Sequence, residues 1–166
     1  GFARLGGHPV AVVANQPQVL AGSLDSDGAD KGAHFITVAD SFHLPIVFLA
    51  DNPGVMPGSQ SERHAILRSG ARMYAAQTQA RVPKFTVTLR KAYGFGSMVM
   101  GMIPFDGQSA TFAYPGATMG AMGAAAMSRA RGSDVDEATL LRQMEVEASF
   151  RSAQSFGQDE LISPVE

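Results

Sequence analysis

The amino-acid sequence predicts an α/β domain, in which short strands form a sheet and amphipathic helices cover it. Short runs rich in β-branched residues alternate with stretches whose apolar residues recur at helical spacing. Two of these runs lead into glycine-containing turns, at residues 53–58 and 93–96. The 166 residues, 45% of them hydrophobic, are enough to bury one substantial core, so we expect a single domain.

The first predicted unit is a strand over residues 9–15, closed by Pro17, and then a helix. The helix is expected to begin at Ser26 or Asp27. Its expected inner face has five residues at helical spacing: Gly32, Phe35, Ile36, Ala39 and Phe42.

The second predicted unit begins with a strand over residues 46–50, directly after Pro45. This strand lacks polar alternation, which predicts burial on both faces. Ser59 or Ser61 is expected to cap the following helix through its hydroxyl group. The expected inner face of that helix contains Ile66, Leu67, Gly70 and Tyr74.

The third predicted unit comprises a strand over residues 84–89, the turn at 93–96 and a short helix rich in Met and Gly. Asp106 and Gly107 are typical of a turn, and residues 110–114 of another strand. Small residues then predict a helix over 116–127, and an amphipathic pattern predicts another over 134–155. The methionines of both Met-rich stretches are interpreted as packing residues.

Composition excludes several functions. With no cysteine, the chain has no disulfide, Cys-ligated zinc, iron–sulfur cluster or thiol nucleophile. The net charge is -2 and no basic stripe occurs, so we expect no nucleic-acid partner. No run of about 18 apolar residues and no signal-peptide pattern is found, and we expect no membrane span. A cytoplasmic location is expected, with the mitochondrial matrix as the alternative.

The turn after residues 84–89 is the most informative feature for chemistry. Gly94 and Gly96 permit positive φ angles and close approach of a ligand to the main chain. The helix start that follows adds partial positive charge. Backbone N–H groups in such a turn suit an oxyanion, either an enolate or a urea-type anion.

Several ordered motifs resemble the carboxyltransferase β-subunits of biotin-dependent acyl-CoA carboxylases. They are residues 5–17, 22–27, 51–58 and 90–94, and the ending at 159–164 also resembles that family. The resemblance implies a crotonase-like domain, a superhelix of ββα units. Family subunits carry two such domains, and residues 1–166 look like the C-terminal one. The N-terminal, CoA-binding half is expected to be absent from this chain.

The resemblance also implies a reaction. These enzymes transfer a carboxyl group from carboxybiotin, held on a carrier protein, to the α-carbon of an acyl-CoA, with no metal at this half-site. The C-terminal domain mainly binds biotin, and active sites form between subunits of a homo-oligomer. The implied partners are a biotin carboxyl carrier or biotin carboxylase subunit and the missing N-terminal half. We expect the isolated fragment to be inactive.

Site residues follow from the same resemblance. The N–H groups of Phe95 and Gly96 would hold the biotin urea oxygen, and Tyr93 and Gly94 belong to the same turn. Phe95 replaces a glycine of the family's Gly-Gly-Ala turn, which would be costly if its φ were positive.

Other residues would shape the pockets. Gly54 and Val55, in a segment resembling the family's Pro-Gly-Phe-x-Pro-Gly, would line the biotin pocket. Ser97 and Met98 replace a Tyr-Asp pair of propionyl-type members and would lie near the acyl group. Met98 predicts a larger or more apolar acyl chain.

Alternatives remain open at this point. One is an acyl-CoA decarboxylase or enoyl-CoA hydratase that uses the same loops, and another is a non-catalytic assembly domain with 116–127 as its interface. Ser97 as a peptidase nucleophile is disfavoured, because every histidine precedes it. His34 and His43 do not have a common metal-ligand spacing, and Gly94-Phe95-Gly96 lacks the third glycine of a dinucleotide fingerprint.

Overall fold

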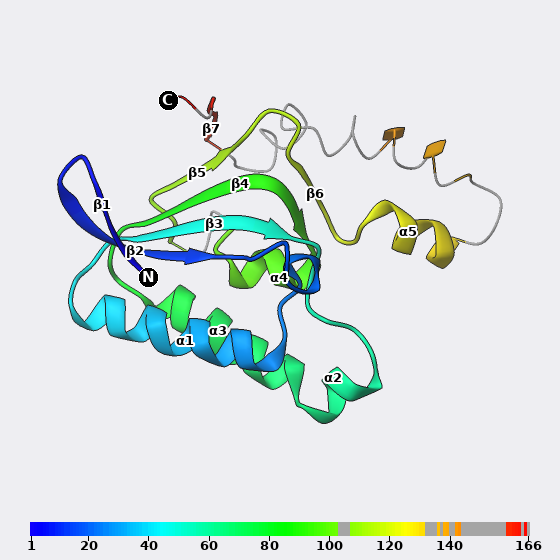
Figure 1. Ribbon diagram of the computed structural model, residues 1–166, viewed down its shortest axis with the longest axis horizontal. Helices are drawn as coiled ribbons and strands as arrows, with labels where there is room; N and C mark the ends of the chain where they lie inside the picture. Colours follow the sequence, from blue (N-terminus) through cyan, green and yellow to red (C-terminus); the bar gives the residue numbers. More distant parts are fainter. Residues whose placement is uncertain are drawn as a thin grey trace.

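The computed structural model describes residues 1–102, 107–131, 136, 138–139, 142–143, 159–163 and 165. Within this part, seven strands form one sheet, and the helices over residues 26–41, 66–79 and 94–99 lie on one side of it (Figure 1). The predicted α/β class is confirmed. The strands are β1 (Phe2–Leu5), β2 (His8–Ala14), β3 (Ile46–Asn52), β4 (Lys84–Tyr93), β5 (Ala110–Ala113), β6 (Thr118–Gly120) and β7 (Glu160–Leu161).

The sheet has the order β1-β2-β3-β4-β5-β7, and β6 pairs with the end of β4. Among the described strands, the β1–β2 pair is antiparallel and the other pairs are parallel. Parallel pairing requires helical crossovers, and these place the carboxyl ends of β2, β3 and β4 at one edge of the sheet. Strand β1 was not predicted. It is exposed throughout and folds back on β2 as a hairpin.

The helices are η1 (Leu20–Gly22), α1 (Ser26–Ser41), α2 (Ser59–Arg63), α3 (Ile66–Gln79), α4 (Gly94–Val99) and α5 (Ala124–Arg131). Figure 1 shows α1 and α3 side by side below the sheet, with α4 between them and the strands. The core is a cluster of apolar side chains between this layer and the sheet. Its largest fully buried members include Phe48, Ile36, Ile46 and Met73.

Helix α1 begins where the sequence predicts. The Asp25 carboxylate accepts a hydrogen bond of 2.8 Å from the Gly28 N–H and caps the helix. Phe42, expected on the inner face, is instead 72% exposed. The reason is that the helix ends at Ser41 and the chain turns through His43, whose φ is 56°.

The expected hydroxyl cap of the next helix is wrong. Gly58, with φ of 113°, precedes α2, and no side chain caps either α2 or α3. The helical conformation is interrupted at Ala65, where φ is 57°, and α3 then starts with a different face toward the core. As a result Leu67 is 56% exposed. The buried residues of α3 are Ile66, Ser69, Gly70, Met73 and Gln77.

The predicted helix over 116–127 is also wrong in its first half. Strand β6 pairs in parallel with residues Lys91 to Tyr93, and α5 begins only at Ala124. The open edge at the end of β4 provides main-chain partners, and strand pairing there overrides the weak helical preference of a glycine-rich segment. The predicted helix over 134–155 and the turn at Asp106 lie mostly outside the described residues.

Candidate functional site

The two glycine loops lie at the edge of the sheet where the parallel strands end. The first, residues 53–58, follows β3, and the second begins at Gly94 after β4. Open α/β sheets bind ligands at the carboxyl ends of their strands, so the topology brings both loops to an edge suited to a site. Gly94, at the start of α4, has φ of 57° and makes the sharp change from strand to helix.

An irregularity in strand pairing directs the second loop toward the first. Ala50 pairs with Thr88, but Asn52 pairs with Ala92, so three residues of β4 lie opposite one residue of β3. Such a bulge bends the strand and increases its twist. The Arg90 guanidinium, within the bulge, lies 3.1 Å from the Asp51 carboxylate. The bulge therefore places the start of α4 beside Asn52.

The loops touch at Gly96, which is buried. A Cβ atom built on Gly96 would lie 2.7 Å from Asn52 Nδ2, 2.8 Å from Asn52 Oδ1 and 2.8 Å from the carbonyl carbon of Gly54. A Cβ on Gly54 would lie 3.7 Å from the Tyr93 carbonyl oxygen. The structure thus brings together the residues that the sequence predicts on two separate segments.

Backbone donors are available on both loops. The first N–H groups of a helix have no acceptor within it, and no side chain caps α4. In the part of the chain that the structure describes, the Phe95 and Gly96 N–H groups have no hydrogen-bond acceptor. On the other loop, Leu24 donates to the Gly54 carbonyl and accepts from the Met56 N–H. This pairing leaves the Val55 N–H without an acceptor among the same residues.

Phe95 does not carry the strain that the sequence comparison with a glycine suggested. It is not among the residues of positive φ, because Gly94 takes that conformation instead. Its ring lies in the core, 6.1 Å from the Tyr74 ring centroid. A Cβ on Gly70 would approach the Phe95 ring to 2.7 Å, so the glycine on α3 makes room for this phenylalanine. The side chain therefore packs inward while its N–H stays available.

Ser97 and Met98 differ in their surroundings. Ser97 is 2% exposed, and its hydroxyl donates a hydrogen bond of 2.7 Å to the Gly94 carbonyl. This contact stabilises the first turn of α4, but it is not a helix cap, because the hydroxyl donates to a carbonyl instead of accepting from a helix N–H. Met98 is half-buried, and its carbonyl accepts a hydrogen bond from the Gln77 amide. That either residue lines an acyl pocket stays a prediction.

Asn52 is a site residue that the sequence reasoning missed. It is fully buried, its Oδ1 accepts a hydrogen bond of 2.7 Å from the Gly54 N–H, and its Nδ2 has no partner among the described residues. The available signal was a polar pair, Asp51 and Asn52, at the end of an otherwise apolar buried strand. Buried polar side chains are usually hydrogen-bonded, so an orphaned amide at a loop junction is unusual.

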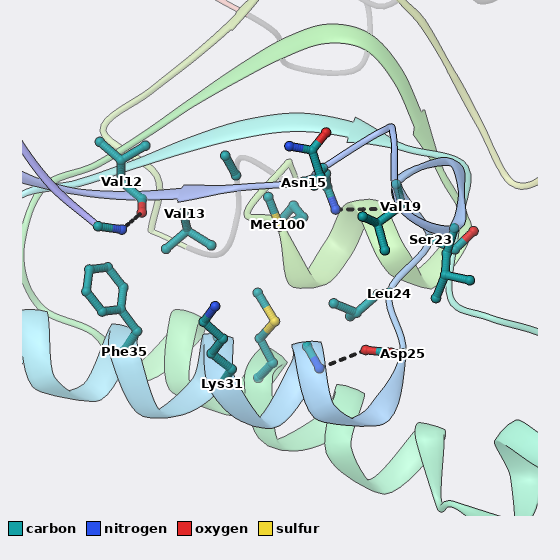
Figure 2. Close-up of a pocket in the computed structure, with 18 of the residues that line it drawn as sticks. Val12, Val13, Asn15, Val19, Ser23, Leu24, Asp25, Lys31, Phe35 and Met100 are labelled. Carbon is teal, nitrogen blue, oxygen red and sulfur yellow. Dashed lines mark hydrogen bonds between the residues drawn. The ribbon is translucent and has the colours of Figure 1, made fainter.

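A separate cavity of about 450 Å³ lies between β2 and α1 (Figure 2). Its walls are mostly apolar, and the Lys31 side chain projects toward β2 in Figure 2. None of the eight predicted site residues lines it. It adjoins the first glycine loop through the segment 22–24, whose Leu24 pairs with Val55. Asn15 holds this segment, since its amide donates to the Gly22 carbonyl over 3.1 Å.

The described residues contain neither a cluster of metal-binding side chains nor a membrane-spanning helix. His34 and His43 are both exposed, and no three His, Cys, Asp or Glu side chains of the described residues gather closely enough to hold a metal ion. Within the same residues, no helix combines the length and hydropathy that crossing a membrane requires.

Comparison with known proteins places the chain in a family. A family model described as the carboxyl transferase domain matches residues 1–165. The β5 subunit of a biotin-dependent acetyl-/propionyl-coenzyme A carboxylase from Mycobacterium tuberculosis is 42% identical over 158 residues, 89% of this chain and 29% of the relative. The 12S subunit of methylmalonyl-CoA carboxyltransferase from Propionibacterium freudenreichii is 48% identical over 123 residues, 74% of this chain and 23% of the relative.

Solved structures give the same result. A crystal structure of transcarboxylase 12S, a hexamer with methylmalonyl-coenzyme A and methylmalonic acid bound, superposes with a TM-score of 0.88 at 38% identity. The match covers 98% of this chain and 33% of the other. A single-chain, multi-domain long-chain acyl-CoA carboxylase also superposes with a TM-score of 0.88, at 30% identity over 98% of this chain and 17% of the other. These matches confirm the crotonase-like fold. The chain spans about a quarter to a third of the length of the curated relatives.

Proposed function

The chain belongs to the carboxyl transferase domain family, and from this premise we propose that it forms the biotin side of the active site of a biotin-dependent acyl-CoA carboxylase. In the proposed reaction the bond between biotin nitrogen and the carboxyl group breaks, and a bond from that carboxyl carbon to the α-carbon of an acyl-CoA forms. The biotin anion that is left accepts the α-proton. The substrates are carboxybiotin on a carrier protein and an acyl-CoA.

The observation that carries this proposal is the meeting of the two glycine loops. As carboxybiotin loses its carboxyl group, negative charge develops on the urea oxygen, and fixed N–H donors stabilise that charge. Phe95, Gly96 and Val55 supply three N–H groups without acceptors in the described residues, and the loops that carry them touch. Because the donors are main-chain groups, the site needs no acid or base side chain.

The proposal extends to the partners. We assign acyl-CoA binding to an N-terminal half outside this chain and biotin delivery to a carrier or biotin carboxylase subunit. Support comes from the relatives, which are described as the β5 subunit of a carboxylase and the 12S subunit of a carboxyltransferase and are three to four times as long. The hexamer of transcarboxylase 12S supports a homo-oligomer.

The test is a carboxyl-transfer assay on the complete subunit, with carboxylated acyl-CoA as donor and free biotin as acceptor. A matched pair of variants examines the donor role. Phe95→Pro and Phe95→Ala both remove the ring, but only proline removes the N–H, and proline is tolerated in the first turn of a helix. We expect Phe95→Pro to have a kcat about 100-fold below that of Phe95→Ala.

Three outcomes would count against parts of this proposal. Equal rates for the two folded variants would remove Phe95 from the donors. The absence of biotin carboxylation by the complete wild-type subunit would overturn the carboxyltransferase function. Product formation from acyl-CoA or enoyl-CoA without biotin would instead favour the decarboxylase or hydratase alternative.

A further inference from the structure

We propose that Asn52 is a positioning residue, whose side-chain amide sets the distance between the two glycine loops and thereby aligns their backbone donors. The proposal rests on the proposed function for the identity of the bound anion. The positioning itself is a property of this chain and is measurable without the reaction.

The first support is the hydrogen bond that ties Asn52 to the first loop. Its Oδ1 accepts from the Gly54 N–H over 2.7 Å, only two residues along the chain. Asparagine side chains commonly fix turns in this way, by bonding their own backbone two residues on. This bond fixes the peptide that carries the Gly54 N–H, and the next peptide, which carries the Val55 N–H, is held through its Gly54 carbonyl by the Leu24 N–H.

The second support is the contact with the other loop. Both amide heteroatoms lie under 3 Å from the position of a Gly96 Cβ. Residue 96 is therefore restricted to glycine by the Asn52 amide together with the Gly54 carbonyl carbon. The amide packs against Gly96 beside the point where the two loops touch, so it fixes how the donors of one loop lie relative to those of the other.

The third support is the unpaired donor. Asn52 is fully buried, and its Nδ2 has no acceptor in the described part of the chain. A buried unsatisfied donor destabilises the folded state, so this amide is not optimal for stability. An apolar side chain of similar size would avoid that cost but would lose the bond to Gly54. The arrangement favours loop geometry over stability.

The experiment uses the complete subunit and two substitutions that separate the bond from the bulk. Asn52→Val keeps a branched side chain beside Gly96 but removes the acceptor for Gly54. Asn52→Ser keeps an acceptor but removes bulk. Thr88→Val is the matched control, because Thr88 Oγ1 is likewise buried without a partner among the described residues but lies in the middle of β4.

Two measurements are made on each variant. Amide hydrogen exchange reports the Gly54 N–H, and we expect it to accelerate at least about tenfold in Asn52→Val with global unfolding unchanged. Steady-state kinetics with free biotin should show kcat reduced about 10- to 100-fold in Asn52→Val and Asn52→Ser, with KM for the acyl-CoA changed less than twofold. Thr88→Val should match the wild type in both measurements.

Each result decides the proposal. Wild-type Gly54 exchange in Asn52→Val would show that the amide does not hold the loop. Faster exchange with wild-type kcat would show that the loop's position does not matter for transfer. If Asn52→Val does not fold, Asn52→Ser carries the same test through kcat. If the wild-type subunit transfers no carboxyl group, the proposed function is wrong, while the exchange experiment still decides the positioning role.

Discussion

At the scale of single residues, the site is determined more by glycines and their neighbours than by reactive side chains. Gly94 takes the left-handed conformation, Gly96 accepts the contact with Asn52, and Gly70 on α3 makes space for the Phe95 ring. Each glycine is required for a different reason. Substitutions at these positions therefore test packing and main-chain geometry directly.

We expect Gly96→Ala to reduce carboxyl transfer by the complete subunit about 100-fold, because its Cβ would push the two loops apart. Overpacking of this kind also costs about 1–3 kcal/mol of stability. Gly123→Ala is the control, since its Cβ would meet only the Tyr93 ring at 3.8 Å, an ordinary contact. Transfer rates and thermal unfolding of both variants check this prediction, and a fully active Gly96→Ala would contradict it.

Met98 provides the prediction on substrate choice. Met98 is half-buried and follows the turn at 93–96, so it offers an apolar surface beside the proposed donors. The complete subunit should therefore prefer acyl-CoA chains longer than propionyl. Met98→Asp should lower kcat/KM for the longer chains about tenfold or more, because burying a charge against them is costly. A panel of acyl-CoA substrates measures this. Clear preference of the wild type for propionyl-CoA would refute the prediction.

Residue-level prediction from sequence succeeded where chemistry follows from residue type alone. Gly94 and Gly96 could be identified because glycines between a strand and a helix permit few other roles. Asn52 could not, because its importance depends on the β4 bulge that brings Gly96 against it. The φ of Phe95 was also not predictable, since it depends on which neighbour takes the left-handed conformation.

At the scale of elements, the carboxyl ends of β2, β3 and β4 are connected into one unit. Asn15 after β2 donates to the Gly22 carbonyl and accepts from the Asp51 N–H, and Leu24 pairs with the loop after β3. The bulge in β4 then connects the end of the third strand to this unit, because it brings Gly96 against Asn52.

The buried strand β3 was predicted correctly, because its burial follows from a run of consecutive apolar residues. The helix predicted over 116–127 was wrong in its first half, because that segment pairs with β4, which is distant in sequence.

We expect Gly22→Ala to destabilise the domain more than Gly6→Ala. Both glycines have positive φ, 85° and 55°, so both substitutions strain the main chain. Only at Gly22 would the new Cβ overlap the Asp51 carbonyl oxygen, whereas Gly6 has open space. The difference in free energy of unfolding should exceed about 1 kcal/mol. Chemical denaturation measures the free energy of unfolding. Equal values for the two variants would show that the contact between Gly22 and the Asp51 carbonyl does not contribute to stability.

At the scale of the whole molecule, the chain carries only part of the proposed machinery. It spans about a third of the transcarboxylase 12S chain on which it superposes, and the CoA-binding half is assigned elsewhere. Its own fold nevertheless includes a complete α/β core with both glycine loops. The fold class and the positions of the main strands along the chain followed from the sequence, whereas the meeting of the loops required the three-dimensional arrangement.

We therefore expect the 166-residue chain alone to fold but to transfer no carboxyl group, and the complete subunit to be active. Circular dichroism of the isolated chain should show helix and strand with a cooperative thermal transition. The transfer assay at equal molar concentration should give a rate at least about 1,000-fold below that of the complete subunit, since the acyl-CoA is not oriented. Transfer by the isolated chain at a comparable rate would refute the division of labour.

The use of main-chain donors has a consequence for how this domain changes over evolutionary time. A peptide N–H persists through every substitution except proline, so substitutions at positions 55 and 95 would not delete the N–H groups that are proposed to stabilise the anion. By the same proposal, point mutations such as those at Met98 would change the acyl specificity while the proposed backbone donors stay in place. We expect stronger selection against substitution at the residues that determine the backbone conformation, which include Gly94, Gly96 and Asn52.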